Sequence, residues 1–178
     1  PNLVLRVAVA AAEFGLPIAP GTLRNLKKCP IGDRNWTDES RELFIRLLAS
    51  GPALLNVWED IDFIDVPGKL IPEWLGVRNR PSASAAHRYT IDRHMVEVVT
   101  RLGRETPSGG RYDDRHYEAL LLAGILHDIG KRPGVANHAA EGARHATVVV
   151  ERMGFDRDIV RWVTLLVREH LTLSEFAT

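Results

Sequence analysis

The residues most able to do chemistry in this sequence are His127 and Asp128, which interrupt the apolar run Leu120–Lys131 (LLLAGILHDIGK). If the run is helical, Leu120 and Gly124 lie on the same face as these two polar residues, because positions three or four apart stack on one side of a helix. A buried carboxylate without a partner costs several kcal/mol, and a divalent metal ion is a natural partner for His and Asp together. The alternative interpretation is an ordinary helix C-terminus, with the imidazole on the last carbonyls and the carboxylate in solvent.

Three of the seven histidines, His94, His127 and His170, fall on the apolar faces of separate predicted helices. His138 opens a fourth helix, directly after a turn that contains glycine. A single histidine of this kind is ordinarily a core or surface residue, but three helices that each direct one inward are an unusual coincidence. Helical bundles build metal sites in this way, from side chains on facing helices. With no cysteine nearby, the pattern suits two hard divalent ions better than a structural zinc.

Helices are also the elements that must position these side chains. Helical spacing of apolar residues, bounded by capping and breaking residues, predicts helices over about 3–14, 23–28, 37–50, 52–64, 89–102, 114–131, 138–153 and 156–170. The stretch 66–80 contains several prolines and glycines and is predicted to be a connector, with Leu70, Ile71, Trp74 and Leu75 packed onto the core. No stretch of useful length alternates as a strand does, so the predicted fold class is all-α.

Composition limits the classes of function. The chain has 178 residues, of which 45% are hydrophobic and 26% charged, as in a soluble globular protein. Its formal net charge is zero, so it has no electrostatic footprint for DNA, RNA or an anionic membrane. Cys29 is the only cysteine, which excludes an intramolecular disulfide and fits a cytoplasmic location. The apolar start is interrupted by Arg6 and Glu13, which favours an amphipathic helix over a signal or membrane segment. The absence of an initiator Met suggests a piece of a longer protein.

Three longer blocks carry a resemblance to a known family. They are IPEWLGVRNRPSASAAHRYTIDRH (Ile71–His94), LLLAGILHDIGKRPGVANHAAEGA (Leu120–Ala143) and LVREHLTLSEFAT (Leu166–Thr178). They resemble the HD domain of the bifunctional PII uridylyltransferase/uridylyl-removing enzymes, which belongs to the HD phosphohydrolase superfamily. The superfamily signature is a His on one helix, His-Asp on a later helix and a distal Asp. The residues that match it here are His94 and His127-Asp128.

The resemblance implies an HD-domain helical bundle with an N-terminal helical extension. Residues 1–66 would form the extension, which resembles the segment that links to a nucleotidyltransferase domain in the family. Residues 67–178 would form the HD phosphohydrolase domain, truncated at its C-terminus. The nucleotidyltransferase and glutamine-sensing ACT domains are missing from this sequence, and the distal Asp is expected beyond Thr178. Asp156 and Asp158 are poor substitutes because they lie at a predicted helix start, upstream of His170.

The resemblance also implies an activity. In the family the HD domain removes a nucleotidyl group, UMP or AMP, from a tyrosine of the PII nitrogen-regulatory protein, in a metal-dependent phosphodiester hydrolysis. By this resemblance His94, His127 and Asp128 hold the first metal ion, while His138 and His170 hold a second ion or contact phosphate. The implied cofactor is one or two divalent ions, Mn²⁺ or Mg²⁺, with Zn²⁺ and Fe as alternatives. The implied partner is nucleotidylylated PII.

Two cations are candidates for contact with the substrate phosphate. Lys131 lies one helical turn beyond His127-Asp128 and is a candidate catalytic residue with Asp128, since it can offer a point charge. The alternative for Lys131 is a solvated lysine that the helix dipole favours at a C-terminus. Arg93 belongs to a group of arginines before and within the predicted His94 helix, and the alternative for this group is a solvated face.

Two other functions stay open from the sequence. An HD hydrolase of free nucleotides would act on small nucleotides without a protein partner. A non-catalytic helical module would receive a signal from neighbouring domains, bind no metal and tolerate His127→Ala. The inward histidines argue against this module, because without a metal they are buried polar groups that need other partners.

Overall fold

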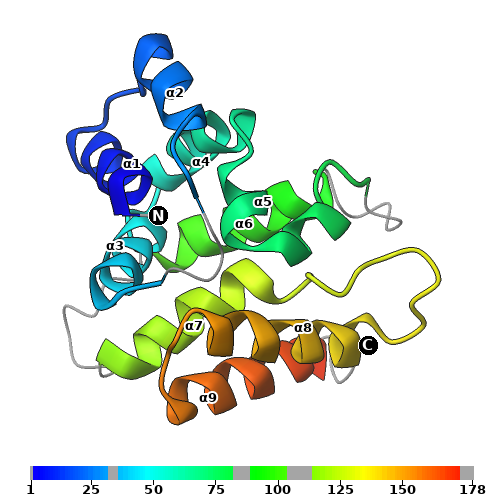
Figure 1. The fold of residues 1–178 in the computed structure, drawn as a ribbon. Coiled ribbons are helices and arrows are strands. Elements are labelled where there is room, and N and C mark those ends of the chain that lie inside the picture. The colour runs from blue at the N-terminus through cyan, green and yellow to red at the C-terminus, as the bar shows by residue number, and fades with distance from the viewer. Residues whose placement is uncertain (1, 32–35, 82–88, 104–113, 173–178) are drawn as a thin grey trace.

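The computed structural model describes residues 2–31, 36–81, 89–103 and 114–172, and every regular element within these ranges is a helix (Figure 1). The elements are α1 (Asn2–Phe14), α2 (Pro20–Lys27), α3 (Asp38–Leu48), α4 (Ala53–Phe63), α5 (Val66–Leu70), the 3-10 helix η1 (Pro72–Gly76), α6 (Ile91–Leu102), α7 (Asp114–Leu126), α8 (His138–Arg152) and α9 (Arg157–Arg168). The predicted all-α fold class is confirmed. None of the helices in the described ranges is both long and apolar enough to cross a membrane.

Local sequence explains where two of these helices begin. Thr37 caps α3 through a capping box, in which the Thr37 hydroxyl accepts the Ser40 N–H and the Ser40 hydroxyl accepts the Thr37 N–H. At α9 the carboxylate of Asp156 accepts the N–H groups of Asp158 and Ile159. Both caps agree with the sequence prediction, because the polar residue stands directly before an apolar periodic run.

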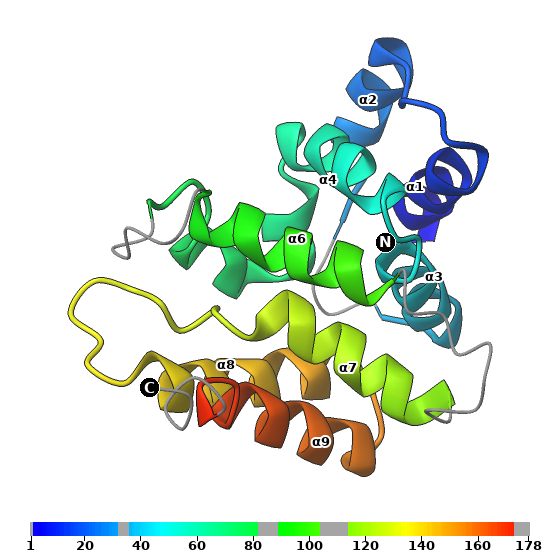
Figure 2. The same ribbon diagram turned by 180° about the vertical axis from the view of Figure 1, so that it is seen from behind.

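The helices form two groups that are joined through α6 and through a direct contact of α3 with α7. In Figures 1 and 2, α1 to α4 gather at one end of the molecule, and α7, α8 and α9 pack together at the other. Helix α6 lies between α4 and α7 and contacts both. One hydrophobic core runs through both groups, from Val4 on α1 to Val167 on α9. The His94 helix is therefore packed from both sides, which fixes its rotation.

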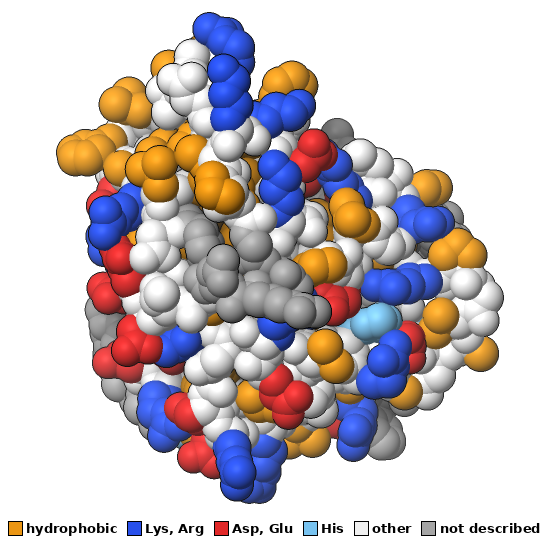
Figure 3. Space-filling model, viewed as in Figure 1, with side chains coloured by type: hydrophobic (Ala, Val, Ile, Leu, Met, Phe, Trp, Pro, Cys, Tyr) orange, Lys and Arg blue, Asp and Glu red, His pale blue; other side chains and the backbone are white. Residues whose placement is uncertain are grey.

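The predicted connector 66–80 contains two short helical elements, α5 and η1. Leu70, Ile71 and Trp74 are buried as predicted. The prediction for Leu75 is wrong, because its side chain is 58% exposed and lies over Gly68 at the surface. Figure 3 shows acidic and basic side chains intermixed over this view of the molecule, in keeping with the formal net charge of zero.

Two helices end earlier than their apolar patterns predict. Helix α7 stops at Leu126, so His127 and Asp128 lie in the turn that follows it, and α9 stops at Arg168, two residues before His170. The turn after α7 brings Gly130 against α8, where a Cβ at Gly130 would lie 2.2 Å from the backbone oxygen of His138. The end of α7 therefore coincides with a close contact between the backbone of this turn and α8.

Candidate metal centre

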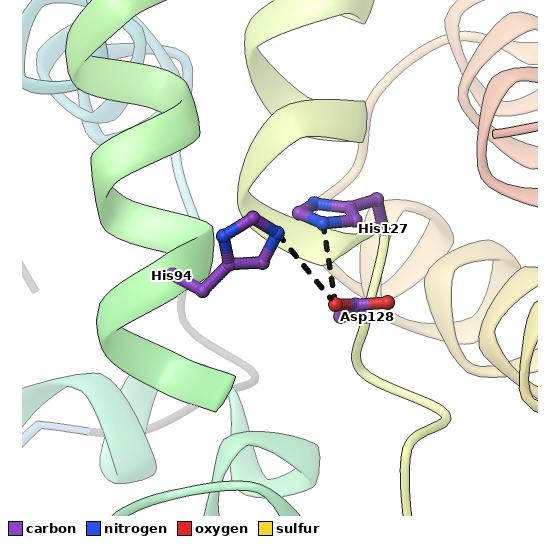
Figure 4. Close-up of side chains that lie close together, drawn as sticks. All are labelled: His94, His127 and Asp128. Atoms are coloured by element: carbon purple, nitrogen blue, oxygen red, sulfur yellow. Dashed lines mark ion pairs between the residues drawn. The ribbon is translucent and has the colours of Figure 1, made fainter. Parts of the chain in front are cut away.

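A buried carboxylate, Asp128, lies at the centre of four imidazoles. Its side chain is 2% exposed. Its Oδ2 atom lies 3.4 Å from Nε2 of His127 and 3.9 Å from Nε2 of His94. Its Oδ1 atom lies 3.4 Å from Nε2 of His170 and 3.8 Å from Nε2 of His138. Figure 4 shows the first half of this arrangement, with His94 approaching from α6 and His127 from the end of α7.

These five residues form two groups that share Asp128. The ligand atoms of His94, His127 and Asp128 all lie within 4.8 Å of one another, and so do those of Asp128, His138 and His170. We call these the first and the second ligand group. The sequence placed Asp128 only with the first ion, so its position between both groups is a finding of the structure.

The second ligand group contains buried polar atoms without hydrogen-bond partners. Oδ1 of Asp128, Nε2 of His138 and Nε2 of His170 are all buried and make no hydrogen bond. Such atoms are rare in folded proteins, because an unpaired buried polar atom keeps its desolvation cost. One carboxylate oxygen and two imidazole nitrogens that converge in this way suit a divalent cation. The residues present therefore fit a metal ion.

Helix ends orient two of the imidazoles. Nδ1 of His127 lies 2.9 Å from the carbonyl oxygen of Gly124, and Nδ1 of His170 lies 2.7 Å from that of Val167. A carbonyl only accepts, so Nδ1 carries the proton in each ring and Nε2 presents its lone pair to the centre. The last carbonyls of a helix lack intrahelical partners. The early ends of α7 and α9 thus leave these carbonyls free to hold the rings.

The electrostatics of the centre keep Asp128 charged. Burial alone would raise the pKa of Asp128, but the facing imidazoles of His127 and His170 and the ammonium of Lys131 together hold it far below its usual range. Burial lowers the pKa of His138. Burial acts in the same direction on His170, but the Asp128 carboxylate and the Val167 carbonyl together outweigh it and raise the pKa of that imidazole. A permanent negative charge therefore lies between imidazole nitrogens, as a cation site requires.

The two predicted phosphate-binding cations lie in different places. Nζ of Lys131 is 2.7 Å from Oδ2 of Asp128, so this lysine belongs to the centre. Arg93 instead pairs with Glu59 and Glu97 and contacts the ring of Tyr89. It lines a separate cavity between α4 and α6.

Other candidate residues lie outside the centre or outside the described ranges. His145 is buried and lies 3.0 Å from a carboxylate oxygen of Glu141. Asp156 caps α9 and does not reach the centre. The segment 173–178, next to which the distal Asp is expected, is outside the described residues.

A cavity of about 680 Å³ opens beside the two ligand groups. Its polar lining residues are His94, His127, Asp128, Lys131 and His170. The rest of its wall is mainly apolar and consists of Val98, Leu102, Leu120, Ala123, Gly124, Leu166 and Leu171. A molecule in this cavity would meet candidate metal ligands, an ammonium and a larger hydrophobic surface.

Sequence comparison finds relatives for the whole chain. It is 39% identical over 181 residues to a bifunctional uridylyltransferase/uridylyl-removing enzyme of Streptomyces coelicolor, covering all of this chain and 21% of that protein. The enzyme of the same name from Mycobacterium tuberculosis (strain H37Rv) is 37% identical, again over all of this chain and 21% of the relative. The Corynebacterium glutamicum enzyme is 32% identical, over 99% of this chain and 25% of the relative. The chain is homologous to one segment of these bifunctional enzymes.

This homology confirms the relationship that the three sequence blocks indicated, at the level of the bifunctional enzymes. The chain spans about a fifth of the length of the first of these relatives. No family model matches the sequence, and no solved structure matches it.

Proposed function

We propose that this chain is the uridylyl-removing part of a bifunctional enzyme, a metal-dependent phosphodiesterase that removes UMP or AMP from a tyrosine of the PII protein. The observation that carries the proposal is the pair of ligand groups that share the buried Asp128. The name of the relatives includes a uridylyl-removing activity, and hydrolysis of a phosphodiester is chemistry that two adjacent divalent ions support. In this proposal 67–178 is the HD phosphohydrolase domain and 1–66 the extension toward the nucleotidyltransferase domain of the longer protein.

The ligand residues have distinct tasks in the proposed reaction. His94, His127 and Asp128 would hold one ion, and Asp128, His138 and His170 the other. Bound Mn²⁺ or Mg²⁺, or alternatively Zn²⁺ or Fe, supplies a Lewis acid and lowers the pKa of a coordinated water. The backbone carbonyls of Gly124 and Val167 keep two imidazoles in the tautomer that can bind a cation.

Lys131 and the apolar wall would bind the substrate. Lys131 lines the cavity together with the ligand residues, so its ammonium can neutralise charge on the phosphoryl oxygens. The apolar wall suits the ring of a tyrosine and its neighbouring residues. The apolar wall favours a nucleotide attached to a protein tyrosine over a free nucleotide as substrate. Apart from its base, a free nucleotide offers mostly polar groups to such a wall.

The test is hydrolysis together with metal content. The chain is purified with Mn²⁺, its metal content is measured by mass spectrometry, and release of UMP from uridylylated PII is followed. The His127→Ala/Asp128→Ala variant serves as control. We expect metal and release in the wild type and neither in the variant. Release only from free nucleotides would favour the alternative hydrolase, and absence of metal from the wild type would favour the non-catalytic helical module.

A further inference from the structure

Arg132, the residue after Lys131, reaches across to a distant element. Its Nη2 donates a hydrogen bond of 2.8 Å to the backbone oxygen of Glu73 in η1, 59 residues earlier in the chain. Its own backbone N–H donates to the oxygen of Gly130 at 2.8 Å. Beyond it the chain is exposed at Pro133 and Gly134. Arg132 is therefore a fixed point at the start of an exposed turn.

Gly76 provides the surface on which the guanidinium rests. A Cβ at Gly76 would lie 2.5 Å from Nε and 2.6 Å from Cζ of Arg132, closer than real Cβ atoms approach. The Nε atom is buried there and makes no hydrogen bond. Any side chain at position 76 would push the guanidinium away from η1, and because this is the end of a flexible side chain, the fold itself has little need to change.

The carbonyl that Arg132 binds is itself held in place. The carboxylate of Glu73 accepts two hydrogen bonds, of 2.9 and 2.6 Å, from the guanidinium of Arg152 at the end of α8. Both side chains are less than a fifth exposed. Two-pronged pairs of this kind fix orientation as well as distance. Helix η1 is thereby tied to α8, and Arg132 ties the turn after α7 to η1.

These contacts bear on Lys131. A lysine side chain has a flexible four-carbon stem, so its ammonium is positioned only if its backbone is held. The Lys131 N–H donates to the oxygen of Asp128 at 2.9 Å, and on its other side the chain is held by Arg132. We propose that Arg132, seated on Gly76, is a positioning residue that keeps the ammonium of Lys131 on Asp128. The contact of Arg132 with η1 does not depend on a bound metal ion. Only its effect on hydrolysis rests on the proposed function.

The reactivity of Lys131 tests the contact without any assay of activity. The metal-free protein is treated with formaldehyde and borohydride, and methylation of each lysine is timed by peptide mass spectrometry. In the wild type Lys131 reacts slowly because its side chain is held against Asp128 and is only 23% exposed to the reagent. In Arg132→Ala and in Gly76→Ala we expect Lys131 to react about fivefold faster, the factor that one hydrogen bond is worth. The exposed Lys27 should keep its rate.

Two comparisons separate positioning from a general loss of structure. Gly21→Ala is the matched glycine control, because a Cβ there would meet Arg24 at an ordinary 3.7 Å, and it should leave the rate of Lys131 unchanged. In the Arg132→Ala background, Gly76→Ala should add nothing, since the guanidinium that it displaces is gone. Unchanged Lys131 reactivity in both single variants would overturn the inference. Equal effects of Gly76→Ala in both backgrounds would also overturn it.

Measurements of UMP release then test whether the contact of Arg132 with η1 matters for the proposed function. With Lys131→Ala as background, Arg132→Ala should cause no further loss of UMP release, while in the wild-type background it lowers kcat and leaves KM unchanged. A wild type that hydrolyses nothing, but whose Lys131 becomes reactive in Arg132→Ala, would refute the proposed function and leave the contact standing. Normal hydrolysis by Arg132→Ala would refute the role in positioning for the reaction.

Discussion

The ammonium of Lys131 lies 2.7 Å from Oδ2 of Asp128, the carboxylate oxygen that also faces His94 and His127. A lysine charge and a divalent cation in the first ligand group would share this oxygen. Lys131 thus weakens cation binding there while placing positive charge where a phosphate would bind. The two effects are separable by mutation.

Lys131→Ala is expected to bind Mn²⁺ more tightly and to hydrolyse more slowly. Removal of about 1.4 kcal/mol of repulsion between the ammonium and the metal ion would raise the affinity for Mn²⁺ about tenfold. Loss of the ammonium as a group that stabilises charge on the phosphate would lower the rate of hydrolysis about 10²-fold. Titration calorimetry with Mn²⁺ and UMP release from uridylylated PII measure the two effects. Lys69→Ala, which removes a lysine on α5, is the control. Weaker Mn²⁺ binding in Lys131→Ala would contradict the prediction.

The shared carboxylate predicts a simple pattern of metal loss. His94→Ala should remove one ion per chain, His170→Ala should remove the other, and Asp128→Ala should remove both, because Asp128 belongs to each ligand group. Metal content after gel filtration, measured by mass spectrometry, gives the counts. His116→Ala, which changes a histidine stacked on Trp162, is the control and should keep the wild-type count. Retention of one ion by Asp128→Ala would show that the two groups do not share this ligand.

Much of the centre could be predicted because short-range patterns determine it. Helical spacing puts His94 on the side of α6 that lines the cavity, together with Val98 and Leu102, and the dipeptide His127-Asp128 fixes two ligands at once. The ion pair between Arg93 and Glu97 could also be predicted from the sequence, because Glu97 lies four residues later on the same helix.

The remaining features depend on contacts between distant parts of the chain. The early ends of α7 and α9 cannot be deduced from apolar periodicity, which continues past both. They accompany two sets of contacts, the packing of Gly130 on α8 and the hydrogen bonds of two histidine rings to helix-end carbonyls. Likewise, no pattern in the sequence pairs Gly76 with Arg132, which is 56 residues away and whose guanidinium lies against it.

A close approach between backbones gives a prediction on stability. A Cβ at Gly103, after α6, would lie 2.7 Å from the backbone nitrogen and 2.9 Å from the Cα of Gly51, in the turn between α3 and α4. Backbone cannot move aside as a flexible side chain does, so Gly103→Ala should lower the free energy of unfolding by about 1–3 kcal/mol. Urea unfolding measures this, with Gly21→Ala as control. An equal free energy of unfolding for the two variants would show that the turn between α3 and α4 can shift without loss of stability.

The pair of Glu73 and Arg152 predicts a dependence of stability on pH. Burial raises the pKa of Glu73, but hydrogen bonds from Arg152 and from the backbone lower it by more, so the pKa lies below its ordinary value. The unfolded chain then binds the proton more readily than the folded one. The stabilisation is complete above the unfolded pKa of about 4.3 and is lost as the pH falls through the lower folded value.

Glu73→Gln removes this dependence. At pH 7 the free energy of unfolding of the variant should be about 2 kcal/mol lower than that of the wild type, the typical value of hydrogen bonds to a charged group. This difference should shrink as the pH falls toward 3. Urea unfolding followed by tryptophan fluorescence at several pH values measures it. Glu13→Gln is the matched control, because Glu13 pairs with Arg46 at the surface, where both side chains are about half exposed and such pairs contribute little. A difference between Glu73→Gln and the wild type that stays constant with pH would show that its origin is packing and not the charge of Glu73.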